Sequence, residues 1–168
     1  MRDVEVRQLM LMRHAKAEAN GASDHARELT DRGRRDARSV GDWLEGQGLR
    51  PSYVLVSSAA RARSTWTGVR SGLRGVADVD SVVLDALYGA DAEEVVAECT
   101  VHIPPEATTA LVIGHNPTIE TAAGLLCSDS APDTSMPTSA VAVIAVDCPW
   151  QELAPGCGSL VTLHTPRG

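Results

Sequence analysis

Aromatic side chains are scarce in this chain of 168 residues: they make up 3% of it, and phenylalanine is absent. The hydrophobic fraction is nevertheless 43%, so Val, Leu, Ile and Ala must supply the core. Proteins that bind single-stranded nucleic acid stack the bases on aromatic side chains. The composition therefore argues against a nucleic-acid-binding protein of that kind.

Positive charge is also in short supply. The 15 Lys and Arg residues stand against 22 Asp and Glu residues, which gives a formal net charge of -7. Nothing in the sequence resembles the basic stripe of a nucleic-acid-binding protein, so we expect no nucleic-acid partner. A net negative surface opposes the capture of an anionic substrate, although the local field of a cleft can still hold a phosphate group.

Long apolar runs and paired cysteines are missing as well. No apolar stretch is long enough to span a bilayer, and the charged segment 1–7 lacks the apolar region of a signal peptide, so we expect no membrane contact. None of the four cysteines forms a Cys-x-x-Cys pair or has a histidine at zinc-finger spacing. We interpret Cys99, Cys127, Cys148 and Cys157 as reduced thiols of a cytoplasmic protein, although Cys148 and Cys157 flank a turn across which they could meet.

Short apolar runs alternate with stripes of apolar residues at helical spacing. The runs 8–12, 53–56, 79–84 and 110–113 predict strands, and 139–146 and 159–164 predict two more near the C-terminus. Thr30 is a predicted N-cap, with further helices over 62–73, 92–99 and 117–126, the last capped by Asn116 with Pro117 in its first position. This alternation predicts an α/β sandwich with a mainly parallel sheet, in a single domain over residues 1–168.

Three of the predicted strands are followed by residues that suit phosphate chemistry. Arg13 and His14 follow the first strand, Arg61 follows the second, and His115 follows the strand over 110–113. Ligands of such sheets bind outside the carboxyl ends of the strands, so we expect these side chains to converge at one edge.

This set of side chains can hold a phosphoryl group and attack it. The planar guanidinium of arginine matches phosphate oxygens bidentately, and a neutral imidazole is a nucleophile at physiological pH. Neighbouring arginines should favour the neutral form of His14 by charge repulsion. His115 precedes a predicted helix start, where free backbone N–H groups would face a bound phosphate.

Several segments resemble the histidine phosphatase superfamily, also called phosphoglycerate-mutase-like. Leu11–Ala15 resembles its Arg-His signature, with Ala15 in place of the usual glycine. Residues 57–65 resemble its Ser-Pro-x-x-Arg-Ala-x-x-Thr segment, with Ser58 in place of proline. Residues 29–33, preceded by Arg27, and residues 112–117 also match in order. The similarity is closest to the small SixA-like phosphohistidine phosphatases, which implies a three-layer α/β/α sandwich.

The resemblance also implies a role for each matching residue. His14 would be the nucleophile that becomes phosphorylated, while Arg13, Arg61 and His115 would clamp the phosphoryl group. Arg27 and Asn116 would be further phosphate or substrate contacts. Asp85 stands where a mutase-type relative carries its acid. The resemblance implies no metal and no cofactor.

Other charged residues have simpler interpretations. We interpret Arg63 as a solvated helix residue, and Lys16 either as a substrate contact or as a polar loop residue. The remaining arginines of the first helix form an exposed face paired with aspartates: Arg32, Arg34, Arg35 and Arg38. The other three histidines are interpreted as surface or structural residues: His25, His102 and His164.

The sequence thus predicts a phosphatase that acts through phosphohistidine at His14. Its partner would be a phosphorylated protein or a small phosphorylated metabolite, and we expect a monomer or weak dimer. The alternatives are a phosphomutase or small-metabolite phosphatase, or a non-catalytic domain of the same fold that binds a phosphorylated ligand or acts as a scaffold. No segment resembles the lid that a mutase needs.

Overall fold

The computed structural model describes residues 6–75, 79–127 and 135–166, and a single sheet of six strands runs through them. Its strands, in the spatial order β3-β2-β4-β1-β5-β6, are β1 (Arg7–Arg13), β2 (Tyr53–Ser57), β3 (Asp80–Leu84), β4 (Thr109–Gly114), β5 (Val141–Val146) and β6 (Gly158–His164). The first four strands are mutually parallel, whereas β5 lies antiparallel to both β1 and β6. The prediction of a mainly parallel sheet extended by the C-terminal strand pair is confirmed.

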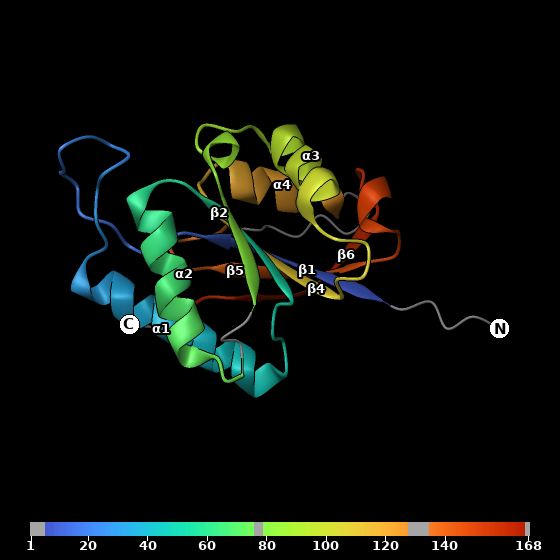
Figure 1. Cartoon of the computed structure of the whole chain (residues 1–168), viewed down its shortest axis with the longest axis horizontal. Coiled ribbons are helices and arrows are strands. Elements are labelled where there is room, and N and C mark those ends of the chain that lie inside the picture. The colour runs from blue at the N-terminus through green and yellow to red at the C-terminus, as the bar shows by residue number, and fades with distance from the viewer. Residues whose placement is uncertain (1–5, 76–78, 128–134, 167–168) are drawn as a thin grey trace.

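Helices cover both faces of this sheet. The α-helices are α1 (Asp31–Gln47), α2 (Ala60–Gly72), α3 (Ala92–His102) and α4 (Thr118–Leu126), and two short 3-10 helices are η1 (Asp85–Leu87) and η3 (Trp150–Glu152). Figure 1 shows α1 and α2 on one face and α3 and α4 on the other, which confirms the three-layer sandwich. None of the helices within the described ranges combines the length and apolar character that crossing a membrane requires.

The central strand β1 shows why such short apolar runs form a buried sheet. Alternate side chains of a strand point to opposite faces, and both faces of this sheet are covered. Met10 and Met12 pack in the core beneath α1 and α2, whereas Leu9 and Leu11 pack in the core beneath α3 and α4. A strand buried on both faces reads as a continuous apolar run, and its carboxyl end is the first position where polar side chains can reach solvent.

The predicted helix ends are confirmed for α1 and shifted for α4. Thr30 caps α1, because its Oγ1 accepts a hydrogen bond from the backbone N–H of Gly33 at 3.0 Å. Gly48 ends the helix with φ of 70°, a backbone conformation that glycine adopts without strain. For α4, the prediction that Pro117 occupies the first helical position is wrong, since Pro117 is the N-cap and the helix begins at Thr118.

Helices α1 and α2 pack so closely that one glycine is required between them. A Cβ atom on Gly41 would lie 2.0 Å from the carbonyl oxygen of Val69. We therefore expect Gly41→Ala to lower the free energy of unfolding by about 1–3 kcal/mol through overpacking. Gly46, in the same helix, is the matched control, because a Cβ there meets nothing within 4 Å. Gly46→Ala should raise that free energy by about 0.5–1 kcal/mol, and equal urea-unfolding midpoints for the two variants would contradict the packing argument.

Candidate active site

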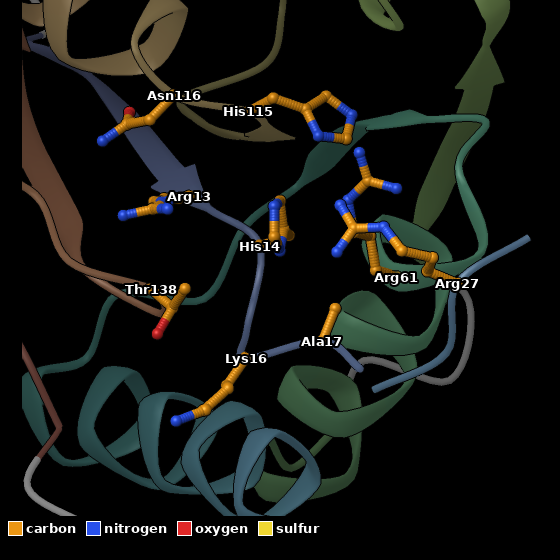
Figure 2. Close-up of a pocket in the computed structure, with 9 residues that line it drawn as sticks. All are labelled: Arg13, His14, Lys16, Ala17, Arg27, Arg61, His115, Asn116 and Thr138. Carbon is orange, nitrogen blue, oxygen red and sulfur yellow. The ribbon is translucent and has the colours of Figure 1, made fainter. Parts of the chain in front are cut away.

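A pocket of about 290 Å³ opens at the carboxyl ends of β1 and β4. The residues that line it are Arg13, His14, Lys16, Ala17, Arg27, Arg61, His115, Asn116 and Thr138. In Figure 2, His14 lies between Arg13 and Arg61, and His115 faces it across the pocket. The structure thus brings together all but one of the residues that the sequence singled out, from segments that are up to about a hundred residues apart.

The backbone around His14 fixes which ring nitrogen can react. His14 follows β1 directly, and its N–H donates to the carbonyl oxygen of Gly114 at 2.9 Å. The ring Nδ1 lies 2.7 Å from the carbonyl oxygen of Ala15, an acceptor only, so Nδ1 carries the proton and donates it. Nε2 is therefore the nitrogen with a free lone pair, which is the position a nucleophile needs.

His14 is neutral at physiological pH. Burial lowers its pKa from 6.5 to about 4, and the charges of Arg61 and Arg13 lower it further against the opposing hydrogen bond to Ala15. The sequence predicted the direction of this shift but assigned it to charge repulsion by arginines. Desolvation is the larger cause, because a cationic imidazole at this depth loses its contact with water.

Acid should therefore destabilise the folded protein through His14. The unfolded chain binds a proton near pH 6.5, whereas folded His14 binds it only near pH 4. Between these values the unfolded state holds more protons, so the free energy of unfolding falls as the pH drops from 6.5 toward 4. His14→Gln removes this titration, and we expect a flatter pH dependence for the variant. Urea unfolding of both proteins across that window measures the difference, and parallel curves would contradict it.

His115 lies against His14 and is held by the end of β2. Its Nε2 is 2.8 Å from Oγ of Ser57, and the two histidine rings have centroids 5.2 Å apart. Burial, followed by the proximity of His14, lowers the pKa of His115 to about 4. Both imidazoles are therefore neutral at physiological pH, and each presents one ring nitrogen to the pocket.

Three buried nitrogen atoms of the pocket residues have no partner. Within the described part of the chain, Nε of Arg13, Nε of Arg61 and Nδ1 of His115 are buried and form no hydrogen bond. Buried polar groups in proteins are almost always paired, and leaving a donor unpaired costs about 1–3 kcal/mol. The three atoms come from β1, α2 and the loop after β4, so their convergence on one pocket indicates a site for an anion.

Asp24, which the sequence did not single out, organises the arginines. Its carbonyl and carboxylate oxygens accept hydrogen bonds from the two terminal nitrogens of Arg61 at 2.7 and 3.2 Å. The carboxylate also accepts from Nε of Arg27 at 3.0 Å and from the hydroxyl of Tyr88 at 2.6 Å. The hydrogen bond from Tyr88 is the largest cause that lowers the pKa of Asp24 to about 2, so this carboxylate stays ionised.

Two of the predicted site residues, Asn116 and Asp85, do not offer a free side-chain group to the pocket. Asn116 lines the pocket, but its side-chain N–H groups donate to Glu120 and to the carbonyl oxygen of Met136, and its Oδ1 accepts from the backbone N–H of Glu120. The backbone N–H of Ile119 likewise donates to His115 O, so these two amides at the start of α4 are not free for a phosphate. Asp85 opens η1, is exposed and does not line the pocket.

Three further residues, which were not among the predicted site residues, are part of this region. Lys16 and Thr138 line the pocket. His25 is a structural residue, one of the two roles predicted for it: its Nε2 lies 2.9 Å from Oγ of Ser58 and its ring packs edge-on against Tyr88. No local signal identifies His25 or Asp24, since both lie in a loop of mixed polar residues and meet their partners only in the fold.

The donor set of the pocket suits an anion rather than a metal ion. The described residues of its lining include two imidazoles but no carboxylate or thiol, and four Lys and Arg side chains add positive charge. Within the described ranges, the one cluster with metal-ligand spacing is Asp147, Cys148 and Cys157, whose ligand atoms lie within 4.8 Å of one another. It follows the far end of β5, opposite to the pocket, and all four cysteines are free thiols, as the sequence predicted.

Comparisons with known proteins agree with this geometry. Residues 9–111 match the sequence profile of the histidine phosphatase superfamily, branch 1. An uncharacterized protein of Mycobacterium tuberculosis is 38% identical over 93% of this chain and 100% of its own. The phosphohistidine phosphatase SixA of Escherichia coli is 31% identical over 83% of this chain and 86% of its own.

Solved structures extend the comparison to three dimensions. A chain from Nakamurella multipartitia, described as a candidate phosphohistidine phosphatase SixA, has a TM-score of 0.83 and 31% identity and covers 97% of this chain and 98% of its own. A structure of the protein histidine phosphatase SixA complexed with tungstate has a TM-score of 0.80 and 30% identity, over 94% of this chain and 96% of its own.

Proposed function

Because this chain belongs to the histidine phosphatase superfamily and is therefore a phosphatase, we propose that it removes phosphoryl groups from phosphohistidine on a protein, with His14 as its nucleophile. One observation carries the choice of nucleophile: the lone pair on Nε2 of His14 borders a pocket with three unpaired buried nitrogen atoms. A second observation carries the choice of substrate: among the described residues, none that lines the pocket has a carboxyl group.

The proposed reaction has two displacements on phosphorus. Nε2 of His14 attacks the phosphorus atom of a phosphohistidine whose second ring nitrogen carries a proton. The phosphorus–nitrogen bond breaks, the substrate histidine leaves as a neutral imidazole, and His14 becomes phosphorylated on Nε2 with Nδ1 still protonated. Water then attacks the phosphohistidine, which releases inorganic phosphate and restores neutral His14. The N–H groups of Arg13 and Arg61 and the ring of His115 stabilise the negative charge on the equatorial oxygens in both steps.

The leaving group decides between the candidate substrates. An alkoxide needs a proton from an acid as it leaves, whereas a phosphohistidine protonated on its second ring nitrogen already carries the proton that lets it leave as a neutral imidazole. The carboxylate nearest the arginines, Asp24, has a pKa of about 2 and carries no proton to give. Asp85, the acid that the resemblance implied, does not line the pocket. Phosphohistidine therefore fits this site better than a phosphoester of a small metabolite.

The relatives support the same proposal. Tungstate, which the SixA structure holds, is a tetrahedral oxyanion like phosphate, and E. coli SixA is by name a phosphohistidine phosphatase. Arg13, His14, Arg61 and His115 are all present here, which disfavours a non-catalytic scaffold.

We further propose a single domain over residues 1–168, a cytoplasmic location supported by four cysteines outside any disulfide, and a monomer or weak dimer.

Three substrates test the proposal. We expect rapid hydrolysis of a peptide phosphorylated on histidine, slower hydrolysis of an aryl phosphate with its good leaving group, and very slow hydrolysis of glycerol phosphate. Asp85→Asn should change kcat/KM for all three by less than about twofold, because an exposed side chain outside the pocket contributes little. A fast reaction with glycerol phosphate that Asp85→Asn abolishes would replace this proposal with that of a small-metabolite phosphatase.

A further inference from the structure

Among the described residues, Lys and Arg side chains are confined to one part of the molecule. From Gly75 to Pro166 the sequence contains no Lys or Arg, although it contains many Asp and Glu residues. This stretch forms β3 to β6 with α3 and α4, so the helical layer on one face of the sheet has no cationic side chain (Figure 1). The Lys and Arg side chains of the described residues lie in the first half of the chain, which supplies α1, α2 and the four cationic residues of the pocket lining.

Two of these cations line a hollow between α1 and α2. Arg34 and Arg38 of α1 face the α2 residues Ser64, Thr67, Gly68 and Ser71 around a volume of about 290 Å³. Arg34 forms an exposed ion pair with Asp31 at 3.5 Å, and Arg38 has no ion-pair partner within the described ranges. Because exposed ion pairs are weak, both guanidiniums can donate hydrogen bonds to a carboxylate of another molecule.

The two helices that line this hollow also contact the loop that follows His14. Gly33, beside Arg34, packs so tightly on Lys16 that a Cβ there would lie 2.1 Å from the Lys16 carbonyl oxygen. Thr65, beside Ser64, accepts a hydrogen bond from the backbone N–H of Ala15 at 2.9 Å. The first turn of α1 and the first half of α2 therefore contact the loop that follows His14, and this loop supplies Lys16 and Ala17 to the pocket lining.

We propose that this hollow binds an acidic segment of the substrate protein, next to the phosphohistidine that enters the pocket. The inference rests on the proposed function and adds to it a partner chemistry. Guanidinium forks bind carboxylates bidentately, and the hydroxyl of Ser64 offers a further donor. The acidic α3–α4 layer repels the same segment, so charge both attracts and orients the substrate on the α1–α2 side.

A pair of peptides tests the proposal directly. One carries phosphohistidine with flanking glutamates, and the other has glutamines in their place. We expect the wild-type enzyme to favour the glutamate peptide by about 3- to 10-fold in kcat/KM, the range expected for two exposed charge pairs. The double variant Arg34→Gln/Arg38→Gln should lose this preference because its KM for the glutamate peptide rises. Its hydrolysis of a small aryl phosphate should stay unchanged.

Arg35→Gln is the matched control. It removes the same charge from the same helix, but Arg35 is exposed and does not line the hollow. The control should keep the preference for the glutamate peptide. If Arg35→Gln and the double variant lost the preference for the glutamate peptide equally, the hollow would not be a specific site. The preference would then come from the overall positive charge of the helix. No preference in the wild-type enzyme would overturn it as well.

A binding measurement separates this inference from the proposed function. A short glutamate-rich peptide without phosphate should bind the wild-type protein, and the double variant should bind it more weakly than Arg35→Gln does. If it binds in this way while the phosphohistidine peptides are not hydrolysed, the proposed function fails and the site stands. If the peptides are hydrolysed but binding is equal in all variants, the site fails. An RNA oligonucleotide that displaces the peptide at equal concentration would also overturn the assigned partner.

Discussion

His14→Ala is expected to lower kcat for phosphohistidine hydrolysis by about a thousandfold or more, because the variant lacks the atom that forms the covalent intermediate. Nε2 of His14 is the nucleophilic position, since Nδ1 donates its proton to the Ala15 carbonyl oxygen at 2.7 Å. Rapid quenching of the wild-type enzyme with a labelled phosphodonor should trap acid-labile, base-stable phosphate. The variant should trap none.

The other pocket histidine serves as the control for this experiment. His115→Ala also removes a buried imidazole, but it keeps Nε2 of His14 and should still trap label at a reduced rate. Circular dichroism and an unfolding curve establish that both variants fold. A His14→Ala enzyme with wild-type turnover, or label on a residue other than His14, would remove the assigned nucleophile.

Arg61→Ala is expected to lower kcat by about a hundredfold or more, as the loss of a transition-state donor does in other enzymes. The side chain is buried in the pocket and its Nε has no partner within the described residues. Its removal also leaves Asp24 without the guanidinium that it pairs with at 3.2 Å, so a carboxylate would then repel the phosphoryl group. Steady-state kinetics with the phosphohistidine peptide measures the effect.

A second substitution separates these two causes. Arg61→Ala/Asp24→Asn removes the repelling charge and should recover part of the lost activity, mainly through KM. Arg63→Ala is the matched control in the same helix, because Arg63 is exposed and does not line the pocket, and its activity should stay near that of the wild type. A double variant that is slower than the product of the single effects would contradict the role of Asp24.

The motifs at the strand ends made most of the pocket predictable. Apolar runs locate strands, the parallel arrangement places their carboxyl ends at one edge, and polar residues directly after those runs must meet there. Arg13, His14 and His115 were found in this way, whereas Arg61 was chosen among the arginines after the second strand by the family resemblance. Arg27 was reached only through resemblance, because it lies in a loop with no periodic pattern.

The partners of these residues could not be predicted. Asp24 meets Tyr88 across 64 positions of sequence and Arg61 across 37, and no periodicity links such positions. The same limit explains Asp85: its sequence context resembles that of an acid, but η1 leaves it exposed and outside the pocket. Asn116 is in the pocket as predicted, yet its amide is used by Glu120 and Met136.

By itself, the sequence determined the sandwich architecture, the edge of the sheet that holds the site, and the chemistry of the residues at that edge. It could do so because hydrophobic periodicity and strand ends are local properties of the chain. Only the tertiary structure decided which nitrogen of His14 is free, which carboxylate faces the arginines, and that Arg34 and Arg38 line a hollow between α1 and α2. Hydrogen-bond partners, burial and the pKa shifts that burial causes depend on residues from distant segments, and these come into contact only when the chain is folded.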